Sequence, residues 1–138
     1  MEIRETDYDS SGRLLSELLE QHSQSESPGV PPYESRKLCY SAFDGDRCVG
    51  GVTGDMAWRM LYVNLLAVDP ATRGTGLGTR LLDTIERTAK EQGCIVSTLT
   101  TMSWQAPDFY RKCGYEVFGE IRDCPRPGDV KYFLRKTL

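Results

Sequence analysis

The residues of this sequence best suited to binding chemistry are three glycines at alternate positions, Gly74, Gly76 and Gly78. Glycine lets the main chain turn tightly and approach a ligand without a Cβ atom in the way. An apolar run precedes these glycines and a helical pattern follows them. The unpaired N–H groups of the helix start, together with the helix dipole, would attract negative charge. The pattern therefore indicates a site for a phosphorylated ligand.

Two familiar nucleotide motifs fit this stretch poorly. A P-loop needs Lys and then Ser or Thr after its last glycine, whereas Gly78 is followed by Thr79 and Arg80. A dinucleotide fingerprint can start at Gly74 and Gly76, but Thr79 stands where its third glycine belongs. A glycine-rich connector without a ligand is the bland alternative, and it leaves the neighbouring basic and hydroxyl side chains unexplained.

The N-terminal part of the chain predicts a strand, a helix and a loop. Residues 1–6 could form a short edge strand around Ile3. After the N-cap candidates Ser10 and Ser11, four leucines recur at helical spacing and predict an amphipathic helix; they are Leu14, Leu15, Leu18 and Leu19. Residues 23–34 are polar and rich in Pro and Ser, which is typical of a loop.

The central part alternates between strand and helix patterns. Residues 37–43 and 47–56 are strand-like and joined by an Asp-Gly turn, which predicts an antiparallel hairpin. The apolar run 60–68 predicts a central strand that leads into the glycines. An amphipathic helix follows, with its apolar side running from Leu77 to Ala89 and Gly93 placed to end it. Residues 94–101 are rich in β-branched side chains and predict the next strand. The two strands of this strand-helix-strand unit are expected to be parallel.

The remaining elements complete the expected fold. Pro107 begins a short helix that ends at Gly114, and residues 115–118 and 130–134 predict two final strands. We expect one domain over residues 1–138, of mixed α/β class. Its central sheet is mostly antiparallel, is split at one parallel strand pair and is flanked by helices.

Composition excludes several classes of function. Seventeen basic and twenty acidic residues give a net charge of −3, so no nucleic-acid partner is expected. No apolar run approaches the roughly 20 residues that span a bilayer, so neither membrane binding nor export is expected and the predicted compartment is the cytoplasm. Five cysteines without a C-x-x-C pair predict reduced thiols, mostly buried as small hydrophobes, and no metal site. A thiol or serine nucleophile would need a histidine close to it in space as a base, and the single histidine, His22, lies in the N-terminal amphipathic segment, so this type of catalysis is poorly supported.

Two motifs resemble one known family. The pattern Arg-x-x-Gly-x-Gly, formed by Arg73, Gly76 and Gly78 after an apolar strand, resembles the acetyl-CoA motif of the GCN5-related N-acetyltransferases. The segment Gln-Ala-x-x-Phe-Tyr-x-x-x-Gly-Tyr, from Gln105 to Tyr115, is similar to the second signature of that family. Together the motifs cover about residues 60–118. The resemblance implies acetyl-CoA as co-substrate and an amine as acceptor.

The resemblance also implies roles for individual residues. It places the pyrophosphate of coenzyme A on the amides of residues 73–78 and on the Thr79 hydroxyl, and the pantetheine arm on the strand end 66–68 and on Gln105. Tyr110 matches the general acid for the departing thiolate. The implied cofactor-binding set is Leu66, Ala67, Val68, Arg73, Gly74, Thr75, Gly76, Leu77, Gly78, Thr79, Gln105 and Tyr110.

The general base and the acceptor are less defined. Several members carry a glutamate on the central strand where this sequence has Tyr62, so ordered water leading to Tyr62, Asn64 or Glu34 is the expected proton path. The expected acceptor is a small-molecule amine. A protein N-terminus or lysine, and a non-catalytic acyl-CoA sensor, are the alternatives. Edge strands near the C-terminus offer a seam for a homodimer.

Overall fold

The computed structural model describes all residues from 1 to 138, and the chain divides into two compact units, Met1–Glu34 and Ser35–Leu138. The first unit contains helix α1 (Tyr8–Glu26). Its N-cap is Asp7, whose carboxylate accepts a hydrogen bond from the Ser10 amide at 2.9 Å, so the predicted caps Ser10 and Ser11 were wrong. No helix in the structure is both long enough and apolar enough to cross a membrane.

Two further expectations for the first unit were wrong. Residues 1–6 form no strand, because the unit contains no second strand with which they could pair. The helix also continues through residues 23–26, which were predicted to be loop. Ser, Gln and Glu are acceptable inside a helix, and the chain leaves the helix just before Pro28, which could not continue it.

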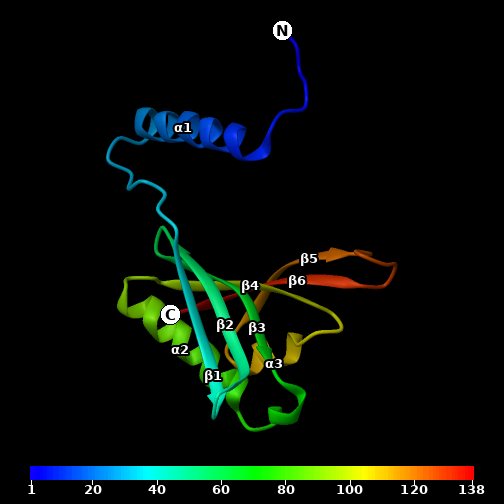
Figure 1. The fold of residues 1–138 in the computed structure, drawn as a ribbon. Coiled ribbons are helices and arrows are strands. Elements are labelled where there is room, and N and C mark those ends of the chain that lie inside the picture. Colours follow the sequence, from blue (N-terminus) through cyan, green and yellow to red (C-terminus); the bar gives the residue numbers. More distant parts are fainter. The chain divides into compact units, whose positions relative to one another are not determined.

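The second unit is built on a six-stranded sheet with the strand order β1-β2-β3-β4-β6-β5 (Figure 1). The strands are β1 (Arg36–Asp44), β2 (Arg47–Ala57), β3 (Met60–Val68), β4 (Val96–Met102), β5 (Glu116–Arg122) and β6 (Val130–Thr137). Only β3 and β4 pair in parallel, and the other four pairings are antiparallel. The predicted mixed sheet with one parallel pair is thereby confirmed, although β5 and β6 extend beyond their predicted limits.

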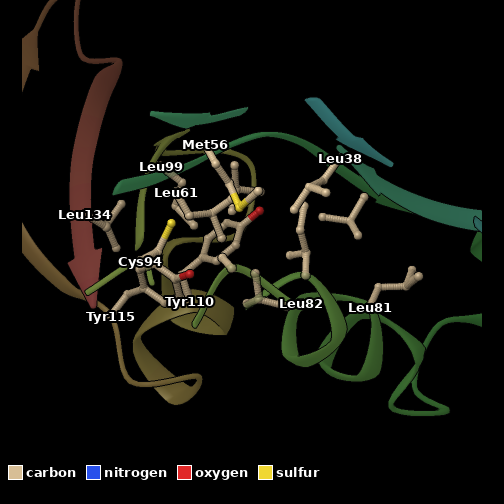
Figure 2. Packing of buried hydrophobic residues seen from close by; sticks show 14 residues of the cluster. Leu38, Met56, Leu61, Leu81, Leu82, Cys94, Leu99, Tyr110, Tyr115 and Leu134 are labelled. Atoms are coloured by element: carbon tan, nitrogen blue, oxygen red, sulfur yellow. The ribbon is translucent and has the colours of Figure 1, made fainter. Parts of the chain in front are cut away.

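The helices of the second unit are the 3₁₀ turn η1 (Pro70–Thr72), α2 (Leu77–Glu91) and the short α3 (Pro107–Lys112). The apolar side of α2 is buried against the sheet, and its members Leu82, Ile85 and Ala89 are fully inaccessible to solvent. Figure 2 shows this cluster, to which β1, β2, β3, β4, α3 and β6 also contribute side chains. The amphipathic pattern predicted for α2 is thus the pattern that fixes it on the sheet.

The cysteines only partly follow their prediction. All five are free thiols, as expected. Cys94 is buried and Cys113 is half-buried, but Cys39, Cys48 and Cys124 are exposed, so the expectation of mostly buried cysteines was wrong. Strand alternation explains Cys39, because Leu38 next to it takes the buried position in β1.

Candidate functional site

The sheet opens between its two parallel strands. The pairing of β3 with β4 covers only residues 60–62 against residues 96–98. Immediately after this pairing, β3 carries a β-bulge, because Thr53 and Gly54 of β2 pair with Leu65 and Val63 and leave Asn64 without a partner. A bulge bends its strand and ends regular pairing. The C-terminal half of β3 therefore leaves β4.

The bulge frees backbone groups along the open edge of β3. The amide of Asp69 donates to the Val49 carbonyl of β2 at 2.8 Å. In an antiparallel ladder, alternate residues point their N–H and C=O groups to the same neighbour, so Ala67 also faces β2. It follows that the backbone groups of Leu66 and Val68 point the other way, toward the gap beside β4. They form an unpaired strand edge inside the molecule.

The glycine-rich loop presents a second set of free backbone groups. None of the six amides of residues 74–79 donates a hydrogen bond within the protein. Gly74 and Gly76 adopt φ angles of +78° and +79°, in the left-handed region that disfavours other residues. Gly78, in the first turn of α2, lets the helix pack closely against α3, because an added Cβ would lie 3.3 Å from the Phe109 ring. This arrangement is an anion site formed by main-chain nitrogens.

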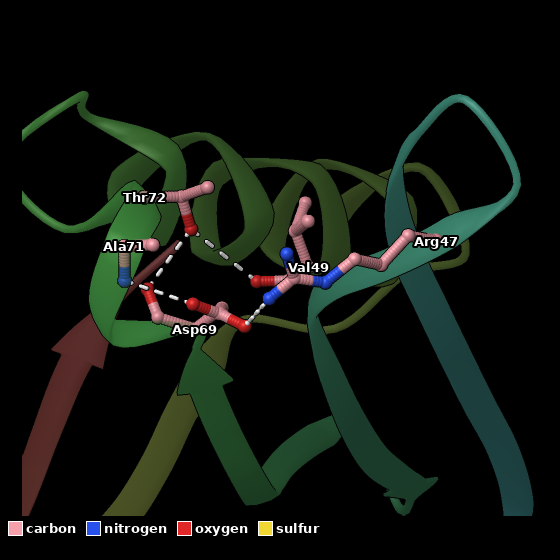
Figure 3. Close-up of polar contacts among 5 residues, drawn as sticks. All are labelled: Arg47, Val49, Asp69, Ala71 and Thr72. Carbon is pink, nitrogen blue, oxygen red and sulfur yellow. Dashed lines mark hydrogen bonds and ion pairs between the residues drawn. The ribbon is translucent and has the colours of Figure 1, made fainter.

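The start of this loop is fastened to β2 (Figure 3). The Asp69 carboxylate accepts from the Ala71 amide at 2.8 Å and pairs with the guanidinium of Arg47. These hydrogen bonds and the nearby positive charge hold the pKa of Asp69 below its usual range. The Thr72 hydroxyl donates to the Asp69 carbonyl at 3.0 Å, and the Thr75 hydroxyl to the Thr72 carbonyl at 2.6 Å. The first part of the loop, from Asp69 to Thr75, is therefore fixed by internal hydrogen bonds.

The free edge of β3 and the free amides of the loop lie on one pocket of about 800 Å³. This volume is within the range of small-molecule sites. Most of the predicted site residues line this pocket, namely Asn64, Leu66, Ala67, Val68, Arg73, Gly74, Gly76, Leu77, Gly78, Thr79, Gln105 and Tyr110. The Thr75 side chain instead bonds the loop itself, Tyr62 does not line the pocket, and Glu34 belongs to the other unit.

Sequence reasoning missed seven lining residues, Leu65, Thr72, Thr100, Thr101, Trp104, Ala106 and Phe109. Thr100 and Thr101 carry no sequence signal, because their access to the pocket depends on β3 moving away from β4. Ala106 and Phe109 lie within the second motif and could have been included on that ground. Trp104 just precedes the motif, and its exposed ring is covered on one side by the guanidinium of Arg126 at 5.7 Å.

Tyr110 is held at the inner wall of the pocket by neighbouring rings. It packs edge-to-face against Phe109 and Tyr115, with ring centroids 5.1 and 5.9 Å away. Burial raises the pKa of the Tyr110 phenol above its ordinary value of 10.0, and the nearby Cys113 thiol adds to this rise. The phenol therefore stays protonated near neutral pH and can act as a proton donor.

Behind Tyr110 lies a buried polar network that fixes Tyr115. The Tyr115 hydroxyl donates to Glu86 Oε1 at 2.7 Å and lies 2.7 Å from the Ser97 hydroxyl. The second oxygen of Glu86 pairs with Lys136 Nζ at 2.7 Å. Burial, the leading cause, raises the pKa of Tyr115 strongly. Since Tyr115 supports the ring of Tyr110, this network positions the pocket wall.

Two predicted ligand contacts have internal partners. The side-chain carbonyl of Gln105 accepts from the Met102 amide at 2.8 Å, so only its NH₂ group is left for a ligand. Burial raises the pKa of the Cys113 thiol, and a hydrogen bond with the neighbouring Thr79 hydroxyl partly opposes this rise. The backbone amides, rather than these side chains, are therefore the main free donors of the pocket.

Comparison with known proteins connects this geometry to a family. The model of the acetyltransferase (GNAT) family matches residues 6–115. The chain is 40% identical over 114 residues to the blasticidin-S acetyltransferase of Streptomyces morookaense, and the match covers 79% of this chain and 83% of the relative.

Two solved structures share the fold. An acetyltransferase from Bacillus cereus ATCC 14579 superposes with a TM-score of 0.82 and 34% identity, covering 100% of this chain and 99% of the other. An aminoglycoside 6'-N-acetyltransferase complexed with coenzyme A has a TM-score of 0.67 at 17% identity, and the match covers 96% and 95% of the two chains. The chain therefore belongs to the acetyltransferase (GNAT) family and is an acetyl-CoA-dependent acetyltransferase.

Proposed function

We propose that the protein transfers the acetyl group of acetyl-CoA directly to a primary amine of a small molecule. The observation that supports this most strongly is the pocket in which the free amides of residues 74–79 and the free strand edge of Leu66 and Val68 lie together. An elongated ligand with an anionic end and an amide-bearing arm fits that combination. Coenzyme A has both parts.

The residues of the pocket fit the two parts of the co-substrate separately. The main-chain nitrogens of residues 74–79 would bind the diphosphate, assisted by the dipole of α2 and the charge of Arg73. The backbone of Leu66 and Val68 would bind the pantetheine arm as if it were an added strand. The amides at the end of β3 would also polarise the thioester carbonyl. Acetyl-CoA, when bound, supplies a reactive thioester.

Tyr110 is the group we assign to the leaving sulfur. The amine nitrogen attacks the carbonyl carbon, a C–N bond forms and the C–S bond breaks. Tyr110 gives its proton to the departing thiolate, and water takes the proton that the nitrogen loses and restores the phenol. Asn64, on the pocket, is the candidate best placed to hold that water, whereas Tyr62 and Glu34 stay predictions.

A small-molecule acceptor is supported by the relative named for blasticidin S, because that similarity covers most of both chains. We treat residues 1–138 as a single functional domain. We place the reaction in the cytoplasm, where the five free thiols would stay reduced. A homodimer through the exposed edge strand β5, rather than through β6, which lies inside the sheet, is the assembly we propose.

The proposal is tested by release of coenzyme A thiol from acetyl-CoA with a panel of acceptors, together with mass spectrometry of the products. The panel contains blasticidin S, an aminoglycoside, simple alkylamines and lysine-containing peptides. Acetylation of a small amine supports the proposal. Faster turnover of the peptides would replace it by protein acetylation, and acetyl-CoA binding without any acetylated product would contradict direct transfer to an amine.

A further inference from the structure

A carboxylate without a cationic partner lies next to the opening of the sheet. In β2 the buried residues Val52, Gly54 and Met56 face α2, and a Cβ on Gly54 would meet the Ile85 side chain at 3.0 Å. Because side chains alternate along a strand, Asp55 points to the opposite face. It is half-buried there. Neither sequence motif includes this residue.

Asn64 connects Asp55 to the pocket. Its side-chain NH₂ donates to Asp55 Oδ2 at 2.6 Å. Asn64 is also the unpaired residue of the bulge, at the point where β3 leaves β4, and it lines the pocket. The same local irregularity that opens the sheet therefore holds the carboxylate at the edge of the opening.

No basic side chain of the protein forms an ion pair with Asp55. It takes part in none of the six ion pairs of the structure. Lys37 is its cross-strand neighbour on β1, but that side chain is exposed and forms no ion pair with it. Its other cross-strand neighbour, Tyr62, has no cationic group to offer. The Asp55 carboxylate has one neutral donor, on Oδ2, so it can still accept a charge-assisted hydrogen bond from a cationic donor.

We propose that Asp55, held by Asn64, binds the ammonium group of the acceptor and restricts the enzyme to amines that arrive as cations. This ammonium gives one proton to water before its nitrogen attacks the carbonyl carbon, and it loses a second proton after the C–N bond has formed. This inference rests on the proposed transfer to a small amine and names the class of that amine. Asp55 selects and orients the acceptor from the face of the sheet opposite α2. The aliphatic or ring portion of the acceptor then has the rest of the pocket.

The first test uses a matched pair of probes, n-butylamine, a cation at pH 7, and 1-butanol. With coenzyme A present, n-butylamine should shift the side-chain amide NMR signals of Asn64, and 1-butanol should not. Asp55→Asn should weaken this binding about tenfold or more, as expected for loss of a charge-assisted hydrogen bond. Asp46→Asn, in the exposed turn between β1 and β2, is the control and should bind as wild type does.

The second test uses the acetylation assay. Asp55→Asn should raise the KM of every accepted amine about tenfold or more and leave the dissociation constant of acetyl-CoA unchanged. Unchanged KM values in this variant, or Asn64 signals that ignore n-butylamine in the wild type, would overturn the assignment of Asp55. Binding of n-butylamine at Asn64 without acetylation of any amine would instead uphold this cation site and contradict the proposed transfer.

Discussion

Replacing Gly76 by alanine separates the conformation of the glycine loop from its packing. Gly76 has a φ of +79°, and a Cβ added there meets no atom within 4 Å. An alanine in this left-handed region costs about 1–2 kcal/mol, and no steric clash adds to that cost. If the loop relaxes in the free protein, the ligand must restore the strained backbone when it binds. The affinity for coenzyme A should then fall about 5- to 30-fold.

The assay for this prediction is calorimetric titration with coenzyme A, together with thermal unfolding of the free protein. Gly76→Ala should change the melting temperature little, because the loop can relax without disturbing the core. Asparagine tolerates the left-handed region better than alanine, so Gly76→Asn should bind with an intermediate affinity.

Gly45 provides the matched control. It also has a positive φ, +59°, and open space around an added Cβ, but it lies in the turn between β1 and β2, away from the pocket. Gly45→Ala should lower the melting temperature and leave the dissociation constant of coenzyme A unchanged. Wild-type affinity in Gly76→Ala, or an equal loss of affinity in Gly45→Ala, would refute the assignment of the loop as the anion site.

Three further predictions follow from the site. Tyr110→Phe should reduce kcat about 100-fold or more and leave acetyl-CoA affinity nearly unchanged, and an equally active variant would contradict the role of Tyr110 as acid. Because burial raises the pKa of Tyr110 above 10.0, the wild type should lose no activity through deprotonation of this group below pH 10. Lys136→Met should destabilise the fold by about 3 kcal/mol in urea unfolding, since it leaves the carboxylate of Glu86 buried without its cation. Adding Glu86→Gln should recover part of this loss. If Lys136→Met does not change the stability, the account of the buried network is refuted. The folded state lowers the pKa of Asp69, so this carboxylate stabilises the fold at pH values above its unfolded pKa of 3.8, and that stabilisation is lost as the pH falls through the lower folded pKa. The difference in melting temperature between wild type and Asp69→Asn should therefore shrink below pH 3.8. A difference that stays constant across this pH range would contradict the role of Asp69.

Local sequence patterns were sufficient to predict those helices and strands whose apolar residues repeat along one buried side. The apolar run 60–68 and the amphipathic helix after the glycines were predicted nearly to the residue, since strand and helix periods differ and each pattern fits only one of them. The N-terminal helix began earlier and ended later than predicted, because a polar segment carries no apolar repeat that defines its limits.

The glycine turn and the helix start behind it could be predicted from local sequence, because each depends on a few neighbouring residues. The resemblance to the family indicated Tyr110. Which backbone groups are free depends on how distant segments pair in the folded chain. The bulge at Asn64 arises from pairing between β2 and β3, and the position of Thr100 and Thr101 on the pocket arises from the divergence of β3 and β4. The position of Asp55 beside Asn64 likewise depends on register between strands. Strand register is set by contacts between residues far apart in the chain, which no local pattern records.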